Sequence, residues 1–150
     1  MPDYDAIRSL MPELVPFVKT LGLVYLELDA ERAVLRLDDE TAFHNHVGGP
    51  HAGAIFTLAE SASGAVVLAS FDDLLSSVTP LAASAQITYT RLAKGPVTAE
   101  AVLGRAAEEV RAELAETGKT VQFPVEVTIR NAEGAETARM TISWALRPQR

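Results

Sequence analysis

Cysteine is absent from the 150 residues of this chain. Without a thiol there can be no disulfide bond, no thiolate zinc site and no cysteine nucleophile. Basic residues are also in the minority, because 13 Lys and Arg residues face 20 Asp and Glu residues for a net charge of −7. A protein that binds the phosphate backbone of nucleic acid needs a basic face. We therefore expect no nucleic-acid partner.

The sequence predicts neither a secretion signal nor a membrane-spanning helix. The first residues, M-P-D-Y-D-A-I-R, are acidic where a secretion signal would be basic and then apolar. Residues 52–70 approach the length of a membrane span, but polar residues interrupt them and favour a helix wrapped by protein. We therefore expect a cytoplasmic protein without membrane contact. The interrupting residues are Thr57, Glu60, Ser61, Ser63 and Gly64.

The length and composition are those of an ordinary folded domain. An apolar fraction of 48% argues against disorder. A chain of 150 residues can bury roughly 70% of its unfolded surface. No repeat, linker or low-complexity tract divides the sequence, so we predict a single domain over residues 1–150.

Three stretches have the spacing of helices. In the first, Asp3 is suited to cap a helix, and Pro12 and Pro16 are expected to break or kink it into short helical pieces. The second predicts one long apolar helix. The third predicts a helical insertion between strands that ends at Gly118. The three stretches are residues 3–21, 51–70 and 106–117.

Alternation of apolar and polar residues predicts several strands, most of them in the second half of the chain. The N-A-E-G sequence at 131–134 predicts a hairpin turn between the last two strands. Pro124 lacks a backbone donor, which favours a bulge or an edge position there. The predicted strands are residues 24–28, 33–37, 85–90, 97–103, 121–130 and 140–146. This order predicts an α+β fold in which an antiparallel sheet curls around one long helix.

The most informative segment is H-N-H-V-G-G-P-H-A-G-A-I-F-T-L-A-E, residues 44–60. A loop rich in Gly, His and Asn leads into the long apolar helix, whose first N–H groups are free to bind negative charge. Glu60 is the only ionisable side chain in residues 52–70. A carboxylate in apolar surroundings costs several kcal/mol unless it is paired, neutralised or used. The segment thus predicts an oxyanion site and a carboxylate on one helix.

This segment resembles the motif N-x-x-G-x-x-H-G-G-x-x-x-x-L-x-D/E of hotdog-fold acyl-CoA thioesterases of the phenylacetic-acid-degradation type. The resemblance extends over about residues 20–147. The sequence of this motif and of the helical insertion is most similar to a poorly characterised branch of that superfamily. Ala52 replaces the first glycine of the H-G-G step, and alanine keeps the backbone N–H. The matching residues are Asn45, Gly48, His51, Gly53, Leu58 and Glu60.

The resemblance implies a homo-oligomer, dimer or tetramer, that hydrolyses an acyl-CoA thioester between subunits. Glu60 would be the general base or the nucleophile, and the N–H of Ala52 or Gly53 would polarise the carbonyl. Asn45 would position the water or the carboxylate, or would only staple the loop. His51 would orient the loop by donating to a carbonyl. No cofactor is implied.

Further residues are expected to contact the substrate. Gly48 and Gly49 would allow positive φ and close approach of a ligand, and Ser63 is also assigned to substrate binding. Arg91 and Lys94 would bind coenzyme A phosphates, or form an ordinary solvated rim. Three histidines near residue 48 suggest a metal cluster, but no Asp or Cys completes a known ligand spacing, so no metal is expected.

Two other functions stay open. A hotdog hydratase or dehydratase would also use a histidine and a carboxylate, and His46 precedes Glu60 by fourteen residues, a spacing similar to that of β-hydroxyacyl dehydratases. Pro50 stands alone where those enzymes have a proline-rich loop. A non-catalytic acyl-CoA or fatty-acid binder is the other alternative.

Overall fold

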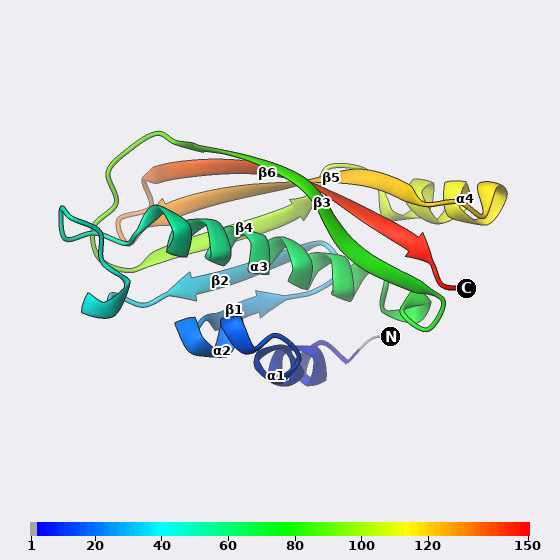
Figure 1. The fold of residues 1–150 in the computed structure, drawn as a ribbon, viewed down its shortest axis with the longest axis horizontal. Coiled ribbons are helices and arrows are strands. Elements are labelled where there is room, and N and C mark those ends of the chain that lie inside the picture. Colours follow the sequence, from blue (N-terminus) through cyan, green and yellow to red (C-terminus); the bar gives the residue numbers. More distant parts are fainter. Residues whose placement is uncertain (1–2) are drawn as a thin grey trace.

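One long apolar helix organises the molecule. The structure is a computed structural model and describes residues 3–150. Helix α3 (Ala52–Ser70) lies along one face of a six-stranded sheet (Figure 1). By length and mean hydropathy α3 could cross a membrane, yet 61% of its most apolar window is buried inside the protein. The prediction of a helix wrapped by protein is confirmed.

The sheet is antiparallel throughout, with the order β1-β2-β4-β5-β6-β3. Short hairpins join β1 to β2 and β5 to β6, whereas β2 reaches β3 through the loop 38–51 and α3. The strands are β1 Val24–Leu28, β2 Arg32–Leu37, β3 Val78–Tyr89, β4 Val97–Leu103, β5 Val121–Asn131 and β6 Glu136–Pro148. The predicted α+β hotdog architecture is confirmed.

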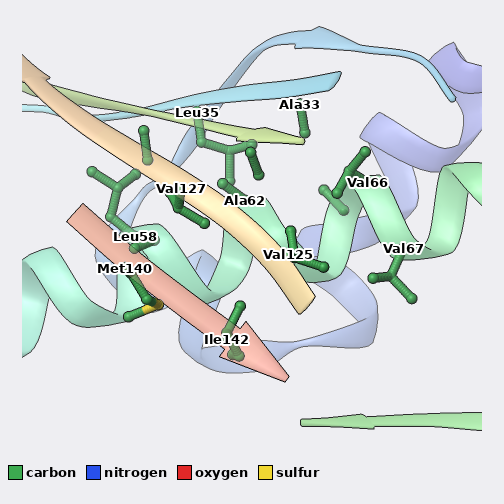
Figure 2. Close-up of a cluster of buried hydrophobic side chains, with 14 of the residues drawn as sticks. Ala33, Leu35, Leu58, Ala62, Val66, Val67, Val125, Val127, Met140 and Ile142 are labelled. Atoms are coloured by element: carbon green, nitrogen blue, oxygen red, sulfur yellow. The ribbon is translucent and has the colours of Figure 1, made fainter. Parts of the chain in front are cut away.

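The core lies between α3 and the sheet. Alternate residues of β5 are buried along its whole length, as the period-2 pattern predicted. Figure 2 shows these side chains and those of β6 approaching the helix. Because α3 carries Ala and Gly at many contact positions, the strands can pack close to it. The labelled core residues include Leu58, Ala62 and Val66 of α3, Val125 and Val127 of β5, and Met140 and Ile142 of β6.

Two short helices at the N-terminus pack beside β1 and α3 (Figure 1). They are α1 (Tyr4–Leu14) and α2 (Pro16–Leu21). Asp3 caps α1 by accepting from the Ala6 N–H at 3.0 Å, as predicted. The chain breaks at Pro16, which begins α2, but Pro12 lies inside α1. The helix is therefore not interrupted at Pro12, and the division into short helical pieces falls at Pro16.

Strand β3 is seven residues longer at its start than the predicted strand, which began at 85. It is an outer strand that pairs only with β6, and most of its residues are exposed. An exposed outer strand needs no apolar alternation, and it tolerates Pro80 because the proline has no donor to contribute to a ladder. These two features hid its first half from the sequence pattern.

The expectation for Pro124 was also wrong. It lies in β5, a central strand, and the irregularity of the β5–β6 ladder falls between Ile129 and Arg130 instead. Pro124 is tolerated because β4 has already ended at Leu103, and Gly104 only needs the Pro124 carbonyl as an acceptor, at 2.8 Å. The missing N–H therefore leaves no ladder partner unsatisfied.

The remaining connections agree with the sequence. Helix α4 (Ala107–Thr117) contacts β5, reaches the end of α3 through the Arg111 guanidinium, which donates to the Ser70 carbonyl at 2.7 Å, and ends at Gly118, which has φ of 61°. The turn at 131–134 has Gly134 at φ of 85°, and the Asn131 side chain accepts from two backbone N–H groups of the turn. Two single-turn helices, Thr41–Phe43 and Asp72–Leu74, flank the long connection through α3.

Candidate functional site

The loop before α3 is held by Asn45. Its side-chain oxygen accepts from the N–H groups of Val47 at 3.0 Å and Gly49 at 3.1 Å, and its amide nitrogen donates to the Pro50 carbonyl at 3.4 Å. All these partners belong to the same loop. Within the subunit Asn45 therefore acts as the staple that the sequence offered as one of its two roles. Its proposed contact with water or carboxylate stays a prediction.

The two loop glycines are required for different reasons. Gly48 has φ of 74°, a left-handed conformation that glycine adopts without strain. Gly49 is buried against the segment after β3, and a Cβ built on it would lie 2.2 Å from the Ala93 carbonyl oxygen. The loop and that segment therefore meet backbone to backbone. Lys94 reinforces the contact by donating to the Val47 carbonyl at 2.6 Å.

His51 is the N-cap of α3. Its Nδ1 accepts from the Gly53 N–H at 2.8 Å, so its proton must sit on Nε2 when the ring is neutral. The histidine does orient the loop, but it accepts from a backbone N–H where donation to a carbonyl was expected. This bond occupies the Gly53 N–H, one of the two candidate oxyanion donors.

The other candidate donor is free. Within residues 3–150 the Ala52 N–H donates to no protein acceptor, and Ala52 is exposed at the first position of α3. The Tyr89 hydroxyl donates to the Ala52 carbonyl at 2.9 Å and so ties the end of β3 to the first helical turn. A free N–H at a held helix N-terminus is a donor for a developing oxyanion.

A groove of about 360 Å³ opens beside this helix start. Arg91, Leu92 and Tyr89 line one side of it, and Asn45 and Ala52 line the other. Arg91 is exposed and forms no salt bridge in the part of the chain that the structure describes. Its predicted contact with phosphate stays a prediction. Lys94 is held by Val47, as described above.

Glu60 lies two turns further along α3 and is half-buried. Burial raises its pKa above the ordinary value of 4.5, and no basic side chain offsets this. A carboxyl group with a raised pKa is suited to accept a proton near neutral pH. Glu60 borders an apolar cavity of about 210 Å³ that is also lined by Gly64 and Trp144.

Tyr25 of β1 is a neighbour of Glu60 that the sequence analysis missed. Its hydroxyl is buried and has no hydrogen-bond partner in residues 3–150. Burial and the nearby Glu60 charge both raise the pKa of Tyr25, so the hydroxyl stays protonated. A buried hydroxyl normally has a partner. The one available signal was a tyrosine within a short apolar strand, which is not specific.

Ser63 is placed one turn beyond Glu60 but is fully buried. Its hydroxyl donates to the Glu60 carbonyl at 2.6 Å and accepts from the Trp144 Nε1–H at 2.9 Å. Both bonds lie inside the subunit, so within one chain Ser63 positions the tryptophan ring. Its predicted substrate contact stays a prediction.

His44 and His46 do not join Glu60. His44 pairs with Asp39, with 2.6 Å between Nε2 and Oδ1, and His46 is exposed on the loop. Among residues 3–150 no three His, Asp or Glu side chains come together as a metal site would require.

The two reactive features are too far apart to act together in one chain. Eight residues separate Ala52 from Glu60 on one helix, and a rise of 1.5 Å per residue places them roughly 12 Å apart. The attacking water must lie about 3 Å from the carbonyl carbon, and the N–H donor about 3 Å from the carbonyl oxygen bonded to that carbon.

The sequence and the fold were compared with known protein families and solved structures. A family described as a domain of unknown function, DUF4442, matches residues 5–146. The chain belongs to this family. It shares 30% identity with a Pseudomonas aeruginosa protein of unknown function described as a probable thioesterase, over 99% of this chain and 97% of that one, with a TM-score of 0.85. No curated protein matches the sequence.

More distant structures share the fold. The Escherichia coli PaaI protein of the phenylacetic acid degradation operon has a TM-score of 0.74 at 18% identity, over 96% of this chain and 92% of that one. A Chlorobaculum tepidum protein of unknown function has a TM-score of 0.85 at 13% identity, over 97% and 94%. The resemblance to hotdog-fold thioesterases of the phenylacetic-acid-degradation type, in a poorly characterised branch, is confirmed.

Replacing Gly49 should damage the loop more than replacing a glycine that needs only its positive φ. Gly95 has φ of 70°, and a Cβ built on it would have no atom within 4 Å. Gly95→Ala should therefore lower the free energy of unfolding by about 1–2 kcal/mol, through backbone strain alone. Gly49→Ala would collide with a backbone carbonyl and should cost more. Urea denaturation of both variants measures the difference, and an equal loss would contradict the close contact.

Glu60→Gln should stabilise the protein at neutral pH. Because burial raises the pKa of Glu60, the folded chain holds this proton more tightly than the unfolded chain. The stabilisation from the protonated form is present below pH 4.5 and is lost as the pH rises through the folded pKa. Glutamine mimics the protonated form, so the Tm of the variant should exceed that of the wild type at pH 7.5.

The Tm difference should shrink as the pH approaches 4. Glu31→Gln, in the exposed hairpin turn, is the control and should show no such trend. A Tm difference for Glu60→Gln that is the same at both pH values would show that the carboxylate is not destabilised by burial.

Proposed function

We propose that this protein hydrolyses acyl-CoA thioesters at a site built from two copies of the chain. The observation that carries the proposal is that α3 holds both a half-buried carboxylate, Glu60, and a free helix N-terminal donor, the Ala52 N–H. The thioesterase description of the Pseudomonas aeruginosa relative supports it.

The chemistry follows from these two groups. Glu60 accepts a proton from water while the water oxygen attacks the thioester carbonyl carbon. The carbonyl oxygen gains negative charge and is stabilised by the Ala52 N–H at the positive end of α3. The carbon–sulfur bond then breaks, the coenzyme A thiolate leaves and takes up a proton, and the carboxylic acid remains. Direct attack by Glu60 through an anhydride would use the same groups.

Coenzyme A would enter along the groove at the start of α3. The exposed Arg91 offers a guanidinium for a phosphate, while Leu92 and Tyr89 offer apolar surface for the pantetheine arm. The Gly49–Ala93 contact holds the two walls of this groove together.

A partner chain is the natural source of the second reactive group. Strand β3 presents its open edge over twelve residues, and Leu81 and Tyr89 are exposed on it. An open edge of this length invites pairing with another strand, and a second copy is the simplest partner because a two-fold axis satisfies both edges at once. We propose at least a dimer.

The activity test is the release of thiol from acyl-CoA substrates, followed with a thiol reagent. Glu60→Gln keeps the shape of the side chain and removes the base, so thioester turnover should fall at least about a hundredfold with KM little changed. Unchanged turnover would remove Glu60 from the mechanism. Loss of enoyl absorbance without thiol release would instead indicate a hydratase, and binding without turnover an acyl-CoA carrier.

A complementation experiment tests the shared site. Ala52→Pro deletes the proposed donor at a helix position where proline is tolerated, and His51 already has the extended backbone, ψ of 142°, that a residue before proline needs. Each variant alone should be inactive. Unfolded and refolded together, the two should recover about a quarter of wild-type activity, because half of the dimers are mixed and each holds one intact site.

Separately refolded variants mixed afterwards are the control and should stay inactive if exchange is slow. Activity that does not return in co-refolded, dimeric protein would place both groups in one chain. Light scattering that gives a mass of 16.1 kDa for the wild type would exclude the dimer.

A further inference from the structure

The apolar cavity beside Glu60 has no role in the chemistry described so far. Its volume is about 210 Å³, and Glu60 is the only charged residue among those that line it. Phosphates and polar groups would lose their hydration there without gaining partners, so the coenzyme A nucleotide does not fit. An apolar group gains by leaving water for such a cavity.

The floor of the cavity follows one stripe of α3. Glu60, Gly64 and Leu68 are spaced four residues apart, so they lie on the same face of the helix, about 12 Å from first to last. Gly64, in the middle of this stripe, lets the Trp144 ring pack close to the helix, because a Cβ on it would lie 3.3 Å from that ring. Leu68 closes the end that is remote from Glu60.

The walls come from three distant parts of the chain, and Pro80 of β3 is one of them. Trp144 of β6 stands on one side, and its ring is fixed by the hydrogen bond from Nε1 to the Ser63 hydroxyl. Met11 of α1, Val18 of α2 and Val15 between the two helices line the opposite side. Without α1 and α2 the apolar stripe of α3 would be open to solvent here.

We infer that this cavity is the acyl-binding pocket, that α1 and α2 form its outer wall, and that it selects apolar acyl groups of six to eight carbons. The inference rests on the proposed thioesterase function. At the ~30 Å³ share of a water molecule, the cavity holds about seven non-hydrogen atoms. The reacting carbonyl would sit at Glu60 and the end of the acyl chain at Leu68.

Leu68 then determines the chain length that the enzyme prefers. It is half-buried, so both smaller and larger side chains can be accommodated without rebuilding the core. Leu68→Phe shortens the pocket, and Leu68→Ala lengthens it. Leu114 on α4 is the matched control, because it is also a half-buried helical leucine but does not line the cavity.

The first measurement is kcat/KM for straight-chain acyl-CoA substrates from two to sixteen carbons. The wild type should prefer six to eight carbons. Leu68→Phe should lower hydrolysis of the eight-carbon substrate about tenfold or more while the four-carbon substrate changes less than threefold. Leu68→Ala should shift the optimum to longer chains. The matched controls, Leu114→Phe and Leu114→Ala, should keep the wild-type chain-length profile. An unchanged profile in active Leu68→Phe and Leu68→Ala overturns the assignment.

The second measurement does not depend on catalysis. Trp144 is the only tryptophan of the chain, so its fluorescence reports on this cavity alone. The probe is 8-bromooctan-1-ol, a neutral eight-carbon chain whose terminal bromine quenches a tryptophan that it contacts. Saturable quenching in the wild type and in Leu114→Phe, with at least tenfold weaker binding in Leu68→Phe, supports the pocket.

The two measurements separate the pocket from the proposed function. If no thioester is hydrolysed but the probe quenches saturably and Leu68→Phe weakens it, the thioesterase function fails and the apolar pocket stands. If thioesters are hydrolysed but the probe does not quench Trp144 and the chain-length profile ignores Leu68, the function stands and the pocket is wrong.

Discussion

The structure depends on the burial of one helix that is apolar on nearly every side. Twelve residues of α3 are buried, and the sheet, the N-terminal helices and the segment after β3 all pack around it. Burying this surface is the main favourable contribution to folding. It also sets the position of the candidate site, because the first turn of α3 carries the free Ala52 N–H and the third carries Glu60. A change in how the sheet packs on α3 would move both.

Glu60 lowers the stability of this arrangement. An apolar residue at position 60 would suit the surroundings better, since burial raises the pKa of the carboxyl group without a basic partner to compensate. Within residues 3–150 the buried Tyr25 hydroxyl beside it has no hydrogen-bond partner. A carboxyl group with a raised pKa next to an unpartnered buried hydroxyl is an expected mark of a functional site, where local stability is lower than packing alone would allow.

The groove at the start of α3 and the cavity beside Glu60 differ in polarity, as the two ends of the proposed substrate do. The groove at Ala52 is exposed and carries the cation Arg91, whereas the cavity beside Glu60 is apolar and is lined by residues of α1, α2 and α3. A thioester has this polarity, with a charged nucleotide at one end and an apolar acyl group at the other. In the proposed acyl pocket, the N-terminal helices, which the sequence predicted only as short helical pieces, form the outer wall.

The sequence by itself determined the element types, the hotdog order and the position of the carboxylate, because these depend on local periodicity and on one charged residue in an apolar run. It could not reveal the first half of β3, since an outer strand with an open edge needs no alternation. It could not show that His51 occupies the Gly53 N–H and leaves Ala52 free. Nor could it bring Tyr25, Trp144 and α1 to Glu60, since those contacts join residues far apart in the chain. Only tertiary packing decides which distant side chains share a cavity.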